Sequence, residues 1–319
     1  MKNIFITGGA GYIGSHCVVS LVKSGYNPII IDNFSTSHQD VIKNLEIITG
    51  KKIIFYNIDI KNKKKLKSIF KKHTCYAVIH CAGFKSVAES IQRPIEYFDN
   101  NIGSTISLLE CMKENNVFKL IFSSSAAVYN DNQSLPLKET DKTGNIKNPY
   151  GNTKYIIEKI LMDIAKSDDR WSIRIARYFN PISNHSSGLI KENPKGIPNN
   201  LVPCIIKVAQ KKVSVLKIFG KNYKTKDGTG VRDYIHVMDL ADGHIAMIKN
   251  NRLKKGLKIY NFGTGKGSSV LDVIKVFKQQ TGIPVSLKFV KKRKGDVAAS
   301  FCSPKKAFKD LNWKSKFDL

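Results

Sequence analysis

The sequence predicts an α/β protein in which a doubly wound parallel sheet is joined to a second, smaller mixed α/β lobe. Short runs rich in β-branched residues recur in the first 180 residues, and segments with the 3.6-residue spacing of amphipathic helices lie between them. Because parallel neighbouring strands need crossover connections, this alternation predicts a sheet with helices on both faces. A change to proline- and glycine-punctuated loop after Pro181 predicts the smaller lobe.

The individual elements follow from the same patterns. The expected strands are the short runs at 3–7, 29–32, 53–59, 77–82, 120–123 and 172–178. The expected helices span 15–23, 95–116 and 150–166. Residues 1–180 are therefore interpreted as a Rossmann-like domain and 181–319 as the smaller lobe. Strand and helix spacing resumes in 234–263, which allows the chain to return there to the large sheet.

The charge of the chain is unusual, because 53 basic and 25 acidic residues give a net charge of +28. Only seven of the basic residues are arginine, the side chain that sequence-specific nucleic-acid readers use for bidentate base contacts. The lysine excess accompanies abundant isoleucine and asparagine, a pattern typical of coding DNA that has drifted toward A and T. We favour this interpretation over a selected nucleic-acid-binding surface and expect no specific nucleic-acid partner.

Other compositional features exclude several classes. With 42% hydrophobic residues and no apolar run near the ~20 residues of a membrane span, the chain is expected to have no membrane partner. The N-terminal stretch lacks the features of a signal peptide, so export is not expected. The six cysteines form no CxxC pair and have no histidine at metal-ligand spacing. No metal site is therefore expected, and reduced cysteines predict a cytoplasmic location.

A glycine-rich turn, Thr7-Gly8-Gly9-Ala10-Gly11-Tyr12-Ile13-Gly14, lies between the first expected strand and the first helix. Glycines let the backbone turn tightly and approach a pyrophosphate, which the helix N-terminus then attracts. Asp32 ends the second expected strand 18 residues after Gly14, where a carboxylate can accept both ribose hydroxyls of an adenosine. A 2′-phosphate would be repelled there, so the pattern predicts NAD rather than NADP.

A second pattern is Tyr150-Gly151-Asn152-Thr153-Lys154 at the start of an expected helix. Four-residue spacing puts Tyr150 and Lys154 on one face, where an ammonium can stabilise a phenolate and lower a pKa of about 10. Such a pair is common on protein surfaces. A catalytic role for the pair is supported by Ser125, which lies at the end of an upstream expected strand. Hydroxyls at the carboxyl ends of strands face the cofactor crevice of such a sheet.

Together these patterns resemble the extended short-chain dehydrogenase/reductase superfamily, and more closely its UDP-glucose 4-epimerase family. The blocks that carry the closer resemblance span almost the whole chain, at 121–126, 148–151, 177–181, 196–201, 227–240 and 293–296. The block from Thr229 to Leu240 is the most specific, because the general superfamily pattern does not predict it.

The resemblance implies a reaction and its residues. Tyr150, helped by Lys154 and Ser125, would take the proton of the sugar 4-hydroxyl while NAD accepts hydride from C4, and the 4-keto sugar would turn before both return. UDP-galactose and UDP-glucose would be the substrates, and UDP-N-acetylhexosamines are a further expectation. Residues 1–180 would bind NAD and 181–319 the UDP-sugar. The implied partner is a second copy of the chain, paired through the helices at 95–116 and 150–166.

The resemblance also supplies binding residues at matching positions. The NAD contacts that it implies, beside Ser125, Tyr150 and Lys154, are Gly8, Gly11, Tyr12, Ile13, Gly14, Asp32, Asn33, Asp59, Ile60, Lys85, Asn100, Tyr178 and Phe179. The substrate contacts that it implies, beside Ser125 and Tyr150, are Asn180, Asn200, Leu201, Phe219, Arg232, Tyr234, Arg293, Asp296 and Ser300. Arg232 and Arg293 would clamp the diphosphate.

Some positions depart from the family pattern. Ala127 replaces a usual threonine and Asn130 a usual glycine, so reduced but measurable activity is expected. Ser300 is small where some members have tyrosine, which is the reason to expect N-acetylated substrates. The sequence stops at Leu319, where the family continues with one more helix, so marginal stability is expected from apolar area left exposed.

Two alternatives remain beside the main interpretation. The first is another nucleotide-sugar member of the superfamily, such as a dehydratase or decarboxylase, although Ala126-Ala127 lies where a dehydratase needs an acid pair. The second is a redox-dead remnant that binds NAD or nucleic acid, which the charge makes conceivable. Intact Ser125, Tyr150 and Lys154 argue against it.

Overall fold

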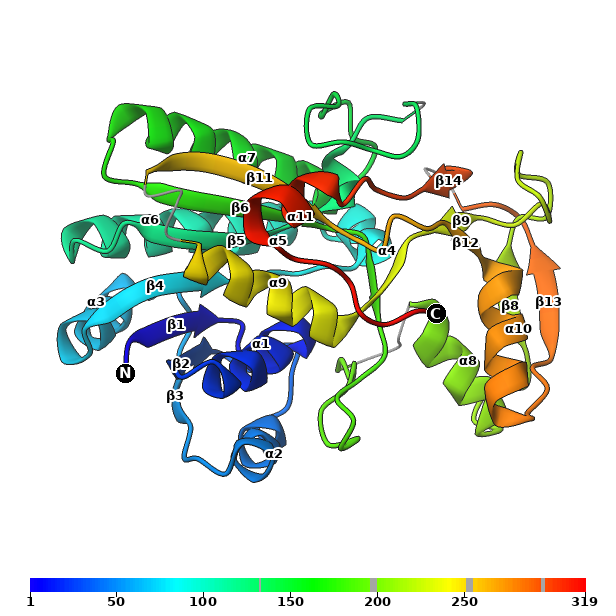
Figure 1. Cartoon of the computed structure of the whole chain (residues 1–319), viewed down its shortest axis with the longest axis horizontal. Helices are drawn as coiled ribbons and strands as arrows, with labels where there is room; N and C mark the ends of the chain where they lie inside the picture. The colour runs from blue at the N-terminus through cyan, green and yellow to red at the C-terminus, as the bar shows by residue number, and fades with distance from the viewer. Residues whose placement is uncertain (132, 196–199, 251–254, 294–295) are drawn as a thin grey trace.

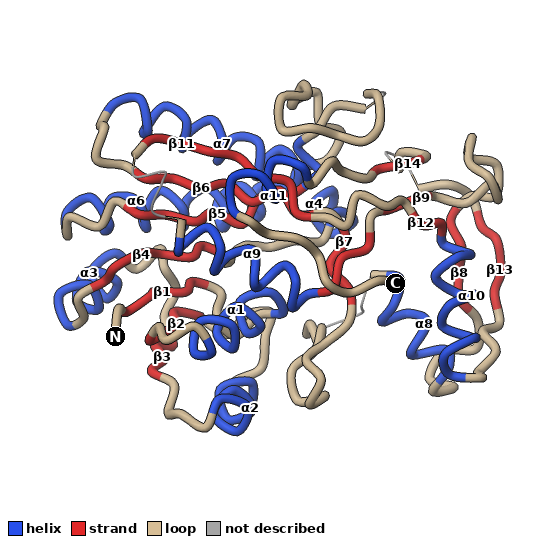
Figure 2. Tube along the Cα trace, in the orientation of Figure 1, coloured by secondary structure: helices blue, strands red, loops and turns tan. Residues whose placement is uncertain are grey.

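The computed structural model describes residues 1–319 except 132, 196–199, 251–254 and 294–295. Its centre is a sheet of seven parallel strands in the order β11-β6-β5-β4-β1-β2-β3 (Figures 1 and 2). The strands are β1 (Asn3–Thr7), β2 (Asn27–Asp32), β3 (Ile54–Asn57), β4 (Cys75–His80), β5 (Lys119–Ser125), β6 (Ser172–Tyr178) and β11 (Gly256–Phe262). The predicted doubly wound parallel sheet is confirmed.

Helices cover both faces of this sheet. On one face lie α1 (Tyr12–Lys23), α2 (Asp40–Thr49), α9 (Val237–Lys249) and α11 (Lys305–Leu311). On the other lie α3 (Lys63–Lys72), α6 (Ser104–Glu114) and α7 (Pro149–Ser167). Successive side chains of a strand point to opposite faces of the sheet, so strands that are covered by helices on both faces are apolar at successive positions. In β1, Ile4 and Ile6 pack into the first core, whereas Phe5 packs into the second.

Two helical segments of the structure differ from what the sequence predicts. The segment expected as one helix at 95–116 is divided into α5 (Pro94–Phe98), a π-helical turn η1 (Asp99–Gly103) and α6. The lysine-rich segment 63–72, for which the sequence pattern predicted no element, forms the helix α3. Its Leu66, Ile69 and Phe70 are buried at helical spacing, and its lysines face outward.

A smaller group of elements lies beyond the carboxyl ends of the parallel strands. Figure 1 shows α8, α10, β8 and β13 gathered at the end of the molecule toward which β1 points. These elements are α8 (Leu201–Ala209), β8 (Leu216–Phe219), α10 (Val270–Thr281) and β13 (Leu287–Val290), and they have a core of their own. The division of the chain into two domains at residue 180 stays a prediction.

Short strands connect the two parts. The pair β7 (Asn180–Ile182) and β10 (Tyr234–His236) is parallel, and β9 (Val231–Arg232) lies between β12 (Ser268–Ser269) and β14 (Ala299–Ser300). The remaining elements are α4 (Val87–Gln92) and the 3-10 turn η2 (Ala126–Val128). In the part of the chain that the structure describes, no helix has the length and apolar character needed to cross a membrane.

Candidate active site

The glycine turn between β1 and α1 is packed so tightly that side chains would not fit. Gly8 has a left-handed φ of 69°, and a Cβ on it would lie 2.6 Å from the Ala82 backbone nitrogen. A Cβ on Gly14 would lie 2.2 Å from the Gly8 carbonyl oxygen. The helix α1 then begins at Gly11 without an acidic residue in its first turn. Its first amides have no partner within the helix, so the turn forms a cradle for a pyrophosphate.

Asp32 lies beside this cradle at the end of β2. Its carboxylate accepts hydrogen bonds from the backbone nitrogens of Ala10 at 3.0 Å and Phe34 at 2.8 Å. Burial raises the pKa of Asp32, and these two backbone donors oppose the rise. The carboxylate is thereby oriented at the crevice where an adenosine ribose would lie, so the residues present fit NAD. Asn33, the next residue, is exposed and accepts from the Ser35 backbone nitrogen.

Ser125 and Tyr150 meet at the carboxyl end of β5. Tyr150 is in the first turn of α7, which begins at Asn148, whose side chain accepts from the Gly151 backbone nitrogen at 2.8 Å. Burial raises the pKa of the Tyr150 phenol, and the Ser125 side chain partly opposes the rise. The structure thus joins the hydroxyl of a strand end to the phenol of a helix start, two groups that are 25 residues apart in sequence.

Lys154 lies one turn further along α7 and is 6% exposed. Its ammonium donates to the Ser123 carbonyl oxygen at 2.8 Å and lies 4.9 Å from the centre of the Phe122 ring. Burial lowers its pKa to about 8. The lysine is therefore held against the strand that carries Ser125, and its direct effect on the Tyr150 phenolate stays a prediction.

The same face of α7 carries Glu158, which sequence reasoning missed. Glu158 forms a bidentate ion pair with Arg177 of β6, at 3.0 and 2.7 Å, and also accepts from Ser124 Oγ at 2.5 Å. Both members of the pair are at most 2% exposed. This network holds the catalytic helix against the two strands that end at the crevice.

The predicted NAD contacts Tyr178 and Phe179, at and just after the end of β6, are both buried. The Tyr178 hydroxyl donates to His244 Nε2, because His244 Nδ1 is occupied by the Leu240 carbonyl oxygen at 2.9 Å. Burial raises the pKa of the Tyr178 phenol and lowers the pKa of His244 to about 4. Tyr178 is therefore fixed in place by a neutral histidine.

Several further predicted NAD contacts lie in loops around the crevice. Asp59 accepts from the Lys61 backbone nitrogen after β3, and Ile60 is buried. Asn100 donates to Asn101, a buried residue of η1 that sequence reasoning missed. Asn101 bonds both the nitrogen and the oxygen of Phe84, and its amide also donates to Thr153 of α7. It thereby connects the loop that carries Lys85 to the catalytic helix.

The segment that follows β7 is hydrogen-bonded to the start of α1 and to the loop after β4. The Tyr12 hydroxyl donates to the Ser183 carbonyl oxygen at 2.7 Å. Glu192, another residue missed from sequence, accepts at 2.6 Å from both the Lys85 ammonium and the Asn200 amide. It therefore links a predicted NAD contact to a predicted substrate contact.

The structure brings some of the predicted substrate residues close to one another. Arg293, Asp296 and Phe219 are brought together: Arg293 Nε lies 2.8 Å from Asp296 Oδ2, and its guanidinium lies 4.8 Å from the Phe219 ring centre. Ser300 of β14 and Arg232 of β9 are also neighbours, because they are register partners in the pairing of these two strands.

The remaining substrate residues occupy the junction between the two parts. Asn180 begins β7, Tyr234 begins β10 and is buried, and Leu201 begins α8. Within the matched blocks, residues 196–199 and 294–295 lie outside the described residues.

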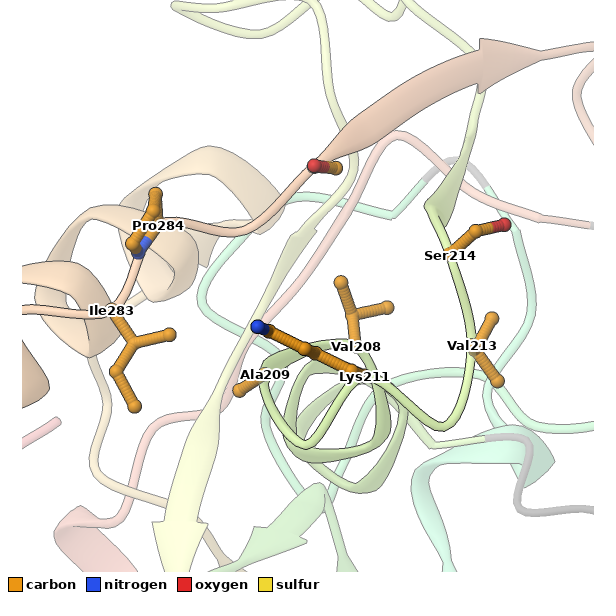
Figure 3. Close-up of a pocket in the computed structure, with 8 residues that line it drawn as sticks. Val208, Ala209, Lys211, Val213, Ser214, Ile283 and Pro284 are labelled. Atoms are coloured by element: carbon orange, nitrogen blue, oxygen red, sulfur yellow. The ribbon is translucent and has the colours of Figure 1, made fainter.

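A separate shallow pocket of about 280 Å³ lies on the smaller group of elements, where α8 ends (Figure 3). Val208, Val213 and Ile283 form its apolar wall, and the Lys211 side chain extends across it. None of the residues that line it belongs to the predicted site. The described residues also include no group of three or more His, Cys, Asp or Glu that could hold a metal ion.

A glycine cradle, an acidic residue at the end of β2 and a Ser/Tyr/Lys set at the end of β5 define a nucleotide-dependent oxidoreductase-type site. The sequence profile of the NAD dependent epimerase/dehydratase family matches residues 4–263, and the chain belongs to this family.

Individual relatives are more specific. UDP-glucose 4-epimerase of Dictyostelium discoideum is 50% identical over 98% of this chain and 91% of its own length, and that of Bos taurus is 45% identical over 100% and 93%. Among solved structures, the Stenotrophomonas maltophila enzyme with NAD and formylated UDP-arabinopyranose has a TM-score of 0.97 at 41% identity, over 100% of this chain and 94% of that chain. The Bifidobacterium longum enzyme with NAD+ and UDP has a TM-score of 0.96 at 44% identity, over 99% and 94%.

Proposed function

We propose that this chain is an NAD-dependent isomerase that interconverts UDP-galactose and UDP-glucose by inverting C4 of the hexose. The observation that carries the proposal is the position of Ser125 at the end of β5 and of Tyr150 in the first turn of α7, at the sheet edge that also carries the glycine turn and Asp32. The full-length similarity to UDP-glucose 4-epimerases supports the substrate class.

The residues of the chain suggest how the reaction proceeds. The chemistry that NAD supplies when bound is acceptance of a hydride from C4 and its return to the opposite face of the sugar. Tyr150 accepts the proton of the 4-hydroxyl as the 4-keto sugar forms and gives it back to the same oxygen after the sugar has turned. Burial raises the pKa of the Tyr150 phenol and Ser125 partly opposes this rise, so Ser125 favours the phenolate that acts as base.

The substrate must be held by its nucleotide while the hexose turns. Arg232 and Arg293 are the cations assigned to the diphosphate, and Phe219 is the ring assigned to uracil. Because Arg293 already lies over Phe219 and beside Asp296, these three form a prearranged nucleotide site. Ser300, small and half-buried beside Arg232, leaves space for an N-acetyl group, so UDP-N-acetylhexosamines are included among the substrates.

Assembly and location are part of the proposal. A homodimer through the helices α5, α6 and α7 would cover Ile95, which is 82% exposed, and Ile106, which is 41% exposed. A cytoplasmic location is supported by the absence of any disulfide bond among the described residues.

The test is cofactor release on denaturation, combined with a coupled assay of UDP-galactose conversion without added NAD. We expect about one NAD per chain and turnover that Tyr150→Phe reduces by roughly 10²–10⁴-fold, because a positioned general base contributes that much. The matched control is Tyr155→Phe on the same helix, which should retain activity. Bound NAD without turnover would favour a redox-dead protein or another substrate, and absence of NAD would contradict the proposal.

A further inference from the structure

Asp233 lies between two residues assigned to the substrate, Arg232 and Tyr234, yet nothing in the sequence gave it a role. Its side chain is completely buried. One carboxylate oxygen, Oδ1, accepts from the backbone nitrogen and the hydroxyl of Thr264, both at 2.7 Å. The other, Oδ2, accepts from the Gly265 nitrogen at 3.0 Å and the Cys302 nitrogen at 3.2 Å, with the Cys302 thiol at 3.5 Å.

The backbone of Asp233 makes two more connections. Its carbonyl oxygen accepts from the Asn180 nitrogen at 2.9 Å, and its own nitrogen donates to the Ser300 oxygen at 3.1 Å. One residue therefore joins the start of β7, the junction of β9 and β10, the end of β14 and the turn that follows β11. Three of these segments carry residues assigned to substrate binding.

The carboxylate is also enclosed from the side of the central sheet. A Cβ on Gly263 would lie 2.4 Å from Asp233 Oδ2 and 2.6 Å from the Cys302 sulfur. Only glycine allows the chain leaving β11 to approach so closely. Both carboxylate oxygens accept hydrogen bonds from separate segments of the chain. A shift of any one segment therefore breaks charge-assisted hydrogen bonds, and in a buried site water cannot replace them.

We propose that Asp233 is a positioning residue that fixes Arg232 and Ser300 relative to the carboxyl end of the central sheet, so that the nucleotide end of the substrate is held in register with Tyr150. The inference rests on the proposed function. It predicts that a change which weakens the Asp233 contacts also weakens binding of UDP but leaves NAD bound, because the glycine cradle and Asp32 belong to other segments.

Two variants of different severity test the proposal. Asp233→Asn places an NH2 group against donors, and Thr264→Val removes only one hydroxyl donor while keeping the carboxylate. The matched control is Thr281→Val, an exposed threonine at the end of α10 whose hydroxyl donates to Phe277. The measurements on the NAD-bound protein are the Kd of UDP by calorimetry, NAD released per chain, and KM and kcat for UDP-galactose.

We expect Asp233→Asn to weaken UDP binding about tenfold or more, Thr264→Val a few-fold, and Thr281→Val not at all. The rise in KM should exceed the fall in kcat, and NAD content should stay at the wild-type value. If Asp233→Asn does not fold, Thr264→Val decides. Unchanged UDP affinity in the folded variants, or loss of NAD together with UDP, would overturn the inference. Failure of wild-type protein to bind UDP would instead contradict the proposed function.

Discussion

At the scale of single residues, Ser300 has the clearest consequence for specificity. It is half-buried and is the register partner of Arg232, so in the proposed site its side-chain volume limits the space for the substrate. We expect the protein to convert UDP-N-acetylgalactosamine as well as UDP-galactose, and Ser300→Tyr to lose the former selectively, because the phenol fills the space of the N-acetyl group.

The measurement is kcat/KM for both sugars, with a fall of at least about tenfold for the N-acetylated sugar alone, the size expected of a steric pocket effect. Ser214→Tyr, in the pocket at the end of α8, is the control and should leave both values unchanged. Absence of any N-acetylhexosamine conversion by wild-type protein at high concentration would refute the idea.

Residue-level prediction worked where the chemistry is local in sequence. Gly8, Gly14 and Asp32 follow from one strand-turn-helix motif, and the structure places them together. Glu158 and Asp233 were invisible, because their roles depend on partners that are distant in the chain, Arg177 in the first case and Thr264 and Cys302 in the second. A carboxylate in a sequence does not reveal which donors the fold will bring to it.

At the scale of elements, a buried ion pair joins the helix α7 to the central sheet. Glu158 on α7 and Arg177 on β6 are both at most 2% exposed, so replacing the carboxylate leaves a buried guanidinium without its counter-charge. Breaking such a pair costs about 3–5 kcal/mol. We expect Glu158→Gln to lower the thermal midpoint by at least about 5 °C and to reduce turnover, because Tyr150 and Lys154 are on the same helix.

The matched control is Glu114→Gln at the end of α6, which removes a pair with Lys67 whose members are 50% and 40% exposed. A solvated pair of this kind contributes little to stability, so the midpoint should barely change. Equal shifts in the two variants, measured by calorimetry with NAD in excess, would show that the buried pair has no special role.

Elements were predicted well where hydrophobic spacing is regular, as in β1 and α7, and poorly where it is interrupted. The π-helical turn η1 was read as continuous helix, because one extra residue per turn leaves no clear mark in the apolar pattern. Its consequence is functional: Asn101 turns inward and bonds Phe84 and Thr153. The helix α3 was overlooked because its lysines obscured its three buried apolar residues.

At the scale of the whole molecule, part of the lysine excess lies on helix surfaces, where it forms solvated pairs such as Lys63–Glu110 and Lys67–Glu114. Pairs of this kind contribute little to stability. The expectation that the charge reflects drift and not a nucleic-acid surface stays a prediction. A net charge of +28 can only grow as carboxylates and histidines take up protons, so the molecule faces increasing self-repulsion in acid.

Three completely buried histidines make the fall of stability in acid steep. Burial lowers the pKa of His16 and His244 to about 4 and that of His80 to about 3. His80 is held between the Thr7 and Thr105 hydroxyls at 2.6 and 2.9 Å, and His16 Nδ1 bonds the Tyr12 carbonyl oxygen at 2.6 Å. Each is therefore neutral in the folded protein over a pH range in which an unfolded histidine, with a pKa of about 6.5, is protonated.

The direction in which stability changes with pH follows from proton linkage. Between pH 6.5 and about 4 the unfolded chain binds up to three more protons than the folded chain at these sites, so the free energy of unfolding falls as pH falls. The loss is about 4 kcal/mol between pH 7.5 and 5.5, at roughly 1.4 kcal/mol per histidine. We expect thermal unfolding with excess NAD to show this fall, and His244→Gln to remove about a third of it. A stability that is flat from pH 7.5 to 5.5 would mean that these histidines accept protons without unfolding.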